Sequence, residues 1–276
     1  MRVLLNVLKR GILLCSTLML SQLALAQDPA YFTRYDNLKM SRNDGILTVT
    51  MHSKGDSLIF GAIPHEQFAD AFYEIGRDRA NRVVILTGAG KDWMGSVDFA
   101  SFGDVTIAGN WAKLVDEGSQ VLENIANIHA PVICAVNGKA WVHTEFCLLA
   151  NYIVAADDAS FMDAPHFTGN IVPGDGIFTT WSYVAGPNRA QAFLLLPSAL
   201  SAKDAQSWGV VNEVVPQAQL LSRAQAIAQE WNKKSALTLR YTRRHFIQPL
   251  KERIVHEVGY GLLLEGDSAQ DSFGKK

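Results

Sequence analysis

Residues 131–165, PVICAVNGKAWVHTEFCLLANYIVAADDASFMDAP, contain two apolar runs rich in β-branched residues, at 131–138 and 152–163. Such runs, bounded by glycine, asparagine and aspartate, predict buried strands. The same pattern occurs twice earlier in the chain, at 45–53 and 82–90. Apolar residues at helical spacing lie between the runs, at 65–78 and 111–127. Strand and helix alternate, so the predicted fold class is α/β.

Helical patterns dominate from Ile177 onward, at 188–196, 202–209, 220–234, 236–247 and 252–267. One short extended piece, 209–216, interrupts them. There is neither a repeat of fixed period nor a low-complexity linker. We therefore expect an α/β core over 27–200 and a C-terminal helical region over 201–276, packed onto the core or onto a neighbouring subunit.

The N-terminus has the pattern of a secretory signal peptide. Arg2, Lys9 and Arg10 precede a short apolar stretch that ends in Ala24-Leu25-Ala26. This pattern predicts a signal peptide over 1–26, cleavage after Ala26, and an exported, periplasmic protein. A single membrane anchor is the alternative, but the short apolar run and the A-x-A step favour cleavage. We expect no membrane association afterwards.

Removal of residues 1–26 would leave a mature chain of 250 residues. They carry 22 Lys+Arg against 27 Asp+Glu, a net charge of about −5, which does not favour nucleic acid as a partner. Cys134 and Cys147 both lie in apolar surroundings. We interpret them as buried thiols, with a disulfide in an oxidising compartment as the alternative.

A histidine and an aspartate stand in the segment DAPHFTGNIVPGDG, residues 163–176. His166 titrates near neutrality and can take a proton from water, while Asp175, bonded to its other ring nitrogen, would fix the tautomer. In the alternative interpretation His166 is an ordinary loop histidine and Asp175 caps a helix that begins near Gly176. The spacing by itself favours the second interpretation.

Four segments, in this order, resemble the crotonase (enoyl-CoA hydratase/isomerase) superfamily: VVILTGAGKDWMGSVDF, residues 131–165, IVPGDG and AKDAQSWGVVNEVVP. The resemblance covers about residues 36–266. It implies a crotonase-like spiral of β-β-α units with a C-terminal helical trimerisation region, and hence a homotrimer or a dimer of trimers. It also implies an oxyanion hole for an enolate, built from the backbone N–H groups of Val97 and His143.

The chain departs from the hydratase members of the superfamily at two positions. Those enzymes use two glutamates to activate water and deliver a proton, and the matching positions here are Phe146 and His166. Glu145 is adjacent to the first position. A one-residue offset on a helix turns a side chain by about 100°, so we do not count Glu145 as a replacement.

The same departures resemble 6-oxocamphor hydrolase and related β-diketone hydrolases, which cleave the bond between two carbonyl groups by a retro-Claisen reaction. The resemblance implies a water-activating dyad of His166 and Asp175, without metal or organic cofactor. His143, at the position of an oxyanion-hole glycine, would donate to the enolate or return a proton to carbon. Glu265, on a late helix, would position His143, water or substrate.

Each of these residues has a structural alternative. His143 can be a packed histidine at a helix start, and Glu265 can be a solvated residue near the C-terminus of an amphipathic helix. Five aromatic residues can line an apolar pocket for a small-molecule substrate, although aromatic residues at such positions more often belong to the core. They are Phe60, Trp93, Phe102, Trp141 and Phe146.

Three functions remain open at this point. The first hypothesis is an exported hydrolase that cleaves a cyclic 1,3-diketone to a keto acid. The second is an enoyl-CoA hydratase or isomerase with relocated acid and base residues, which fold analogy suggests; the missing glutamates and the export of the chain away from coenzyme A argue against it. The third is a binder of a terpenoid-like or aromatic ligand without catalytic activity.

Overall fold

A computed structural model describes residues 28–196 and 198–274. The described residues from Tyr31 onward form one compact unit, which contains the sheets and the cavity. The expected signal peptide, residues 1–26, lies outside the described residues. Within 28–196 and 198–274, no helix is both long enough and apolar enough to span a bilayer.

The main sheet has six strands in the order β1-β2-β4-β6-β8-β11. Antiparallel β1 and β2 form a hairpin around Asp44 and Gly45, both at positive φ, as a tight two-residue turn requires. The other neighbours are parallel, and β6 is buried along its whole length, as expected for a parallel sheet covered on both faces. The strands are β1 (Leu38–Asn43), β2 (Ile46–Met51), β4 (Val83–Gly88), β6 (Val132–Val136), β8 (Tyr152–Ala156) and β11 (Glu213–Val215). This sheet confirms the α/β class.

Four of the long strands are each followed by a two-residue strand and then a helix. The two-residue strands pair with one another in small sheets, β3-β5 and β10-β9-β7. The expected β-β-α spiral is therefore present. The elements that follow the long strands are β3 (Ile59–Phe60) and α2 (Ala62–Arg77), β5 (Ser96–Val97) and α3 (Ala108–Ala126), β7 (Lys139–Ala140) and α4 (Glu145–Leu148), and β9 (Ser160–Phe161) and α5 (Ile177–Ala185).

The C-terminal region contributes to the main sheet as well as adding helices. Strand β11 pairs with β8, and α8 packs on strands β2, β4, β6 and β8. The division at residue 200 stays a prediction. The further elements are η1 (Ala30–Thr33), η2 (Phe99–Phe102), η3 (Phe167–Gly169), α6 (Pro187–Leu195), β10 (Leu200–Ser201), α7 (Ala202–Ser207), η4 (Gln217–Gln219), α8 (Leu220–Asn232) and α9 (Ala236–Phe273).

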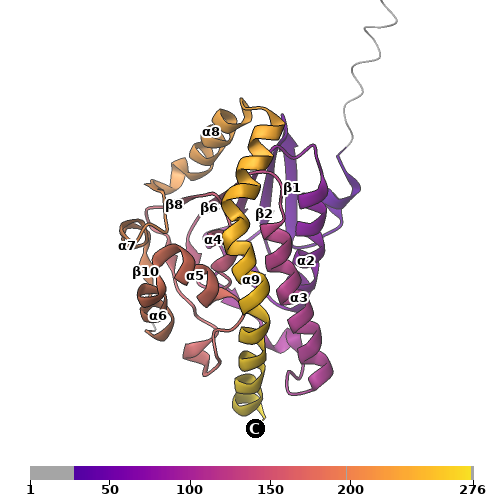
Figure 1. Cartoon of the computed structure of the whole chain (residues 1–276), viewed down its shortest axis with the longest axis vertical. Coiled ribbons are helices and arrows are strands. Elements are labelled where there is room, and N and C mark those ends of the chain that lie inside the picture. The colour runs from indigo at the N-terminus through magenta and orange to yellow at the C-terminus, as the bar shows by residue number, and fades with distance from the viewer. Residues whose placement is uncertain (1–27, 197, 275–276) are drawn as a thin grey trace, which may run out of the picture. The chain divides into compact units, whose positions relative to one another are not determined.

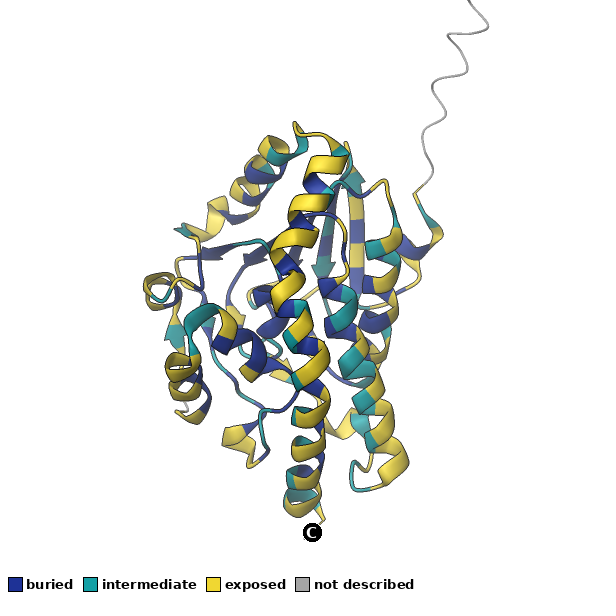
Figure 2. Cartoon of the chain, in the orientation of Figure 1, coloured by how far each residue is buried: buried dark blue, intermediate teal, exposed yellow. Residues whose placement is uncertain are grey.

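Helix α9 is a single helix of 38 residues where the sequence pattern predicted two. Pro249 lies inside it on an exposed face, where water can satisfy the carbonyl group that lacks a partner N–H. Buried side chains recur every four residues at Leu250, Ile254, Val258 and Leu262, and this stripe packs α9 along α3 and α5 (Figure 1). Figure 2 shows buried positions alternating with long exposed stretches on α9.

Cys134 of β6 and Cys147 of α4 form a disulfide, so the interpretation of both as thiols is wrong. Both residues are fully buried, which the apolar surroundings did predict. The chain leaves β6, passes through β7 and turns into α4, and this path returns Cys147 to Cys134. The disulfide therefore ties α4, with the turn before it, to the central sheet.

Candidate active site

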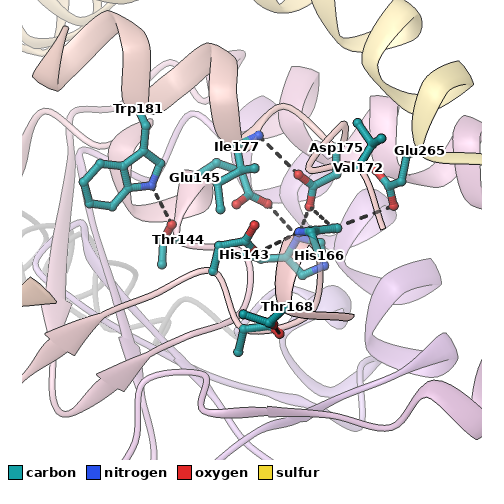
Figure 3. A network of polar contacts seen from close by, with 12 residues as sticks. His143, Thr144, Glu145, His166, Thr168, Val172, Asp175, Ile177, Trp181 and Glu265 are labelled. Carbon is teal, nitrogen blue, oxygen red and sulfur yellow. Dashed lines mark hydrogen bonds and ion pairs between the residues drawn. The ribbon is translucent and has the colours of Figure 1, made fainter. Parts of the chain in front are cut away.

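A cavity of about 230 Å³ opens beside α4 and is lined mainly by apolar side chains. Seven titratable side chains line it: His65, Asp104, His143, Glu145, His166, Asp175 and Glu265. Five of these, all except His65 and Asp104, meet in one network of polar contacts (Figure 3). An apolar pocket with a few convergent polar groups has the composition of a small-molecule site.

Three of the five aromatic residues expected at the pocket line the cavity, namely Phe60, Phe102 and Phe146. The prediction was wrong for the other two. Trp93 is completely buried among core residues. Trp141 donates from Nε1 to Ser160 Oγ, and the Lys139 ammonium lies 4.5 Å from its ring centroid. Both tryptophans flank short strands, and the sequence does not show which side of such a strand faces the cavity.

His143 stands in a tight turn between β7 and α4. Its φ of 47° lies in the left-handed region that favours glycine, which agrees with the glycine that the family resemblance places there. Trp181 Nε1 donates to Thr144 Oγ1 at 2.8 Å and fixes the turn from α5 (Figure 3). The imidazole stacks on Phe146 with ring centroids 5.0 Å apart. The histidine is packed and also lines the cavity.

Nδ1 of His143 faces two carboxylates. It donates to Oε1 of Glu145 at 2.6 Å and lies 3.2 Å from Oδ2 of Asp175. Burial disfavours the imidazolium, but the charges of Glu145 and Asp175 outweigh it and raise the pKa of His143 to about 10. Glu145 is fully buried and lines the cavity; that it does not replace the hydratase glutamate stays a prediction. Helix α4 begins at Glu145, and its first two side chains both reach the cavity.

Asp163, which the sequence analysis did not single out, holds His166. Nδ1 of His166 donates to Oδ1 of Asp163 at 2.7 Å. The sequence contained a signal, because Asp163 stands three residues before His166 in the same segment. Nε2 lies 3.6 Å from Oδ2 of Asp175, longer than a direct hydrogen bond. The expected orienting bond from Asp175 is therefore supplied by Asp163.

The two carboxylate oxygens of Asp175 have different partners, one at the start of a helix and the other among the histidines. Oδ1 accepts from the backbone N–H of Ile177 at 3.2 Å, at the first turn of α5, as a capping residue would. Oδ2 faces both His143 and His166 (Figure 3). Burial opposes ionisation, but the charges of the two histidines outweigh it and hold the pKa of Asp175 below its usual value. Asp175 is the carboxylate that connects the two imidazoles.

Glu265 reaches this cluster from α9, and its interpretation as a solvated residue is wrong. Its side chain is 12% exposed, and Oε1 lies 3.7 Å from Nε2 of His166. A close backbone contact places it, because a Cβ added to Gly174 would lie 2.1 Å from the carbonyl oxygen of Gly261. Glycine at both positions lets the loop before α5 touch α9 one turn before Glu265. Burial raises the pKa of Glu265.

The charge on His166 follows from its surroundings. Burial disfavours the imidazolium, but the charges of Asp175 and Asp163 outweigh it and raise its pKa well above 6.5. Burial and the charge of Asp175 raise the pKa of Glu145 to about 7 against the opposing charge of His143. The network thus holds protons that can move near neutral pH.

His65 is a further cavity residue that sequence reasoning missed. It lies on the buried face of α2, and its Nδ1 donates to Oε2 of Glu117 on α3 at 2.7 Å. Burial lowers the pKa of His65, which favours the neutral ring. The only signal in the sequence was a histidine within the apolar periodicity of 65–78.

Val97 and His143, the expected oxyanion donors, both line the cavity; their role stays a prediction. Two triads within the described residues, His143–Glu145–Asp175 and His166–Asp175–Glu265, bring potential metal-ligating atoms within 4.8 Å of one another. Imidazole and carboxylate suit a transition metal. In the first triad, however, imidazole and carboxylate already bond to each other, and the expectation of no metal or cofactor stays a prediction.

The chain belongs to the Enoyl-CoA hydratase/isomerase family, whose model matches residues 41–260. Carnitinyl-CoA dehydratase of Shigella flexneri is 32% identical over 200 residues, which are 71% of this chain and 74% of the relative. The crotonase resemblance is confirmed.

Solved structures add a more specific similarity. A beta-diketone hydrolase from the cyanobacterium Anabaena sp. PCC 7120, bound to (S)-3-oxocyclohexyl acetic acid, is 47% identical, with a TM-score of 0.88 over 89% of this chain and 98% of that one. An enoyl-CoA hydratase/isomerase from Mycobacterium paratuberculosis is 21% identical, with a TM-score of 0.77 over 87% of this chain and 98% of that one, and it shares the fold.

Proposed function

We propose that the protein is a hydrolase that cleaves a carbon-carbon bond of a cyclic 1,3-diketone by a retro-Claisen reaction. The observation that carries the proposal is the buried imidazole of His166 in an apolar cavity, held by Asp163 at Nδ1 and facing Asp175 and Glu265 at Nε2. The 47% identity to a beta-diketone hydrolase supports the same chemistry.

The ligand of that hydrolase suggests a substrate. (S)-3-Oxocyclohexyl acetic acid contains a ring ketone and a carboxylic acid, the two groups that a retro-Claisen cleavage leaves. Rejoining its carboxyl carbon to the ring carbon beside the ketone, across the ring, gives bicyclo[2.2.2]octane-2,6-dione. The aromatic walls contributed by Phe60, Phe102 and Phe146 suit such a compact alicyclic diketone.

The reaction uses one water. His166 acts in its neutral form, which its raised pKa makes the less populated one, and takes a proton from water while the water oxygen bonds to one carbonyl carbon. The 3.6 and 3.7 Å separations from Nε2 to Asp175 and Glu265 suit groups that a water joins. The bond from that carbon to the α-carbon then breaks, its electron pair passes into the enolate of the second carbonyl, and a proton returns to the α-carbon.

The enolate oxygen needs a preorganised donor. The raised pKa of His143, about 10, keeps its ring protonated at neutral pH, so it can donate to the enolate oxygen. The backbone N–H groups of Val97 and His143 would complete the oxyanion hole. All three roles are part of the proposal.

A second candidate is an acyl-CoA lyase or isomerase, which the 32% identity to Carnitinyl-CoA dehydratase favours. The positions that the resemblance matches to the hydratase glutamates hold Phe146 and His166. Hydration of crotonyl-CoA, followed by the loss of thioester absorbance in the ultraviolet, tests this candidate.

Export and assembly belong to the same proposal. The predicted signal peptide directs the chain to the periplasm, and a disulfide within the core suits an oxidising compartment. Helix α9 exposes large apolar side chains, which suits a homotrimer or a dimer of trimers: Leu237, Tyr241, Phe246, Val255, Tyr260 and Leu263.

The decisive experiment incubates the purified mature chain with bicyclo[2.2.2]octane-2,6-dione and other cyclic 1,3-diketones and detects keto acids by mass spectrometry. We expect hydrolysis by the wild type and a loss of at least about 1,000-fold in kcat for His166→Ala. Full activity of that variant would refute the assignment of His166. A diketone that raises the Tm without being cleaved would indicate a binder instead.

A further inference from the structure

The proposed reaction leaves one step without an assigned residue, the return of a proton to the α-carbon. Two buried acids other than Asp175 enter the cavity beside the histidines, Glu145 and Glu265. Glu265 lies beside Nε2 of His166, where water is activated. Glu145 lies beside His143, where the enolate oxygen would be held.

Glu145 has one oxygen occupied and one free. Oε1 accepts from Nδ1 of His143, whereas Oε2 is buried and has no hydrogen-bond partner among the described residues. A buried carboxylate oxygen without a partner is destabilising, because it has lost its hydrogen bonds to water and gained none in return. The cost falls if the oxygen carries a proton or contacts a ligand. Glu145 lines the cavity, but its side chain is fully covered by protein, so Oε2 must turn towards a bound substrate to make that contact.

Burial and, after it, the charge of Asp175 raise the pKa of Glu145 and favour its protonated form, against the opposing charge of His143. Oδ2 of Asp175 lies 3.2 Å from the same Nδ1 of His143, and the two carboxylates beside one imidazole repel each other. An enolate has two reactive ends, its oxygen and its carbon. His143 can hold the oxygen, and the neighbouring acid group can reach the carbon beside it.

We propose that Glu145 is the catalytic acid that protonates the α-carbon of the enolate, an inference that rests on the proposed retro-Claisen reaction. The O–H bond at Oε2 breaks, a C–H bond forms at the α-carbon, and the enolate electron pair becomes that bond. Glu145 is left as a carboxylate and His166 as an imidazolium carrying the proton from water. Transfer of that proton to Glu145 restores the starting state, so protons balance over one turnover.

The proton count predicts a pH profile. Between the pKa of Glu145, about 7, and the higher pKa of His166, the two residues share one proton, and the reaction uses the arrangement with the proton on Glu145. Below about pH 7 both are protonated, no base remains, and kcat falls. The charged groups that face this pair from the surrounding segments are His143, Asp163, Asp175, Glu265 and, beyond His143, His65.

The test follows the cleavage of bicyclo[2.2.2]octane-2,6-dione in D₂O by wild type, Glu145→Gln and Glu117→Gln. Glu117 is the matched control, because it also accepts from Nδ1 of a buried histidine but lies outside the cavity lining. We expect the wild type and Glu117→Gln to place deuterium on one face of the α-carbon. Glu145→Gln should lose about 100-fold in kcat, place deuterium on both faces, and show a fall in kcat that begins at the higher pKa of His166 in place of the fall near pH 7.

Retention of single-face deuteration and of kcat within fivefold by Glu145→Gln would overturn this role while leaving the hydrolase intact. If the wild type cleaves no 1,3-diketone, the proposed function fails and this role fails with it. Should Glu145→Gln not fold, Glu145→Asp keeps an acid group on a shorter side chain. Glu145→Asp should retain single-face deuteration at reduced kcat. If Glu145→Asp deuterated the α-carbon as fast as wild type does, proton transfer would not depend on the reach of the acid group, which would contradict this role.

Discussion

Nδ1 of His166 lies 2.7 Å from Oδ1 of Asp163, and both side chains are buried. The bond leaves Nε2 as the ring nitrogen that faces the cavity cluster. Asp163→Asn keeps the size of the side chain but lets its amide stabilise the wrong tautomer. We expect kcat for diketone hydrolysis to fall by about 100-fold or more, with a nearly unchanged KM.

Asp158→Asn is the control for that variant, because Asp158 is exposed between β8 and β9, and it should keep wild-type activity. Steady-state kinetics at neutral pH measure both variants. A kcat of Asp163→Asn within threefold of wild type would show that Asp163 does not position His166 for catalysis.

Stability should decline with rising pH. His143 has a folded pKa of about 10 against an ordinary value of 6.5, so its contribution is complete below pH 6.5 and is lost as the pH rises towards 10. The pKa of Glu145 is raised from 4.5 to about 7, so Glu145 adds a further loss of stability as the pH rises between those two values. We expect the Tm to fall between pH 5 and 10 at constant ionic strength.

Replacing His143 measures how much of the fall in Tm with rising pH this residue causes. In His143→Asn the fall in Tm between pH 7 and 10 should be shallower than in wild type, as measured by differential scanning calorimetry. Parallel curves for the two proteins in this range would show that the His143 imidazolium does not stabilise the fold.

The glycine contact between the loop before α5 and α9 should be essential for the site. A Cβ added to Gly261 would lie 2.2 Å from the carbonyl oxygen of Gly174, so Gly261→Ala must push the two segments apart and carry Glu265 away from His166. We expect a loss of about 1–3 kcal/mol in the free energy of unfolding and a lower kcat.

Gly259→Ala is the matched control in the same helix. A Cβ there meets nothing within 4 Å, and alanine raises helix propensity by about 1 kcal/mol, so stability should be equal or higher and kcat unchanged. Urea unfolding measures the free energy of unfolding of Gly261→Ala and Gly259→Ala, and steady-state kinetics measure their kcat. If Gly261→Ala behaved like Gly259→Ala, the backbone contact would not control the placement of Glu265.

The disulfide between Cys134 and Cys147 should be present in mature protein from an oxidising compartment. Alkylation in denaturant, followed by mass spectrometry, should label neither cysteine without reductant and both with it. A closed loop of this length, with a sequence separation of 13, contributes about 3 kcal/mol to the free energy of unfolding, so cytoplasmic, reduced protein should have a lower Tm. Labelling of both cysteines in the exported protein would contradict the bond.

Local sequence patterns predicted the parallel strands β2, β4, β6 and β8, because apolar runs between turn residues have few other solutions. They did not separate β8 from β9, nor did they join the two predicted segments of α9 across Pro249. Whether a helix ends at a proline depends on whether the residues around the proline gain enough from burying their side chains in a continuous helix. Here the stripe of Leu250, Ile254, Val258 and Leu262 keeps the helix continuous.

The sequence by itself determined the alternation of strand and helix, the family motifs, and the presence of His143, His166, Asp175 and Glu265 in them. Only the tertiary structure decided which carboxylate meets which imidazole. Asp163 rather than Asp175 bonds to Nδ1 of His166, and Glu145 enters the cavity. These pairings depend on side-chain directions at turns and on the approach of α9 to a distant loop, and local periodicity carries no information about either.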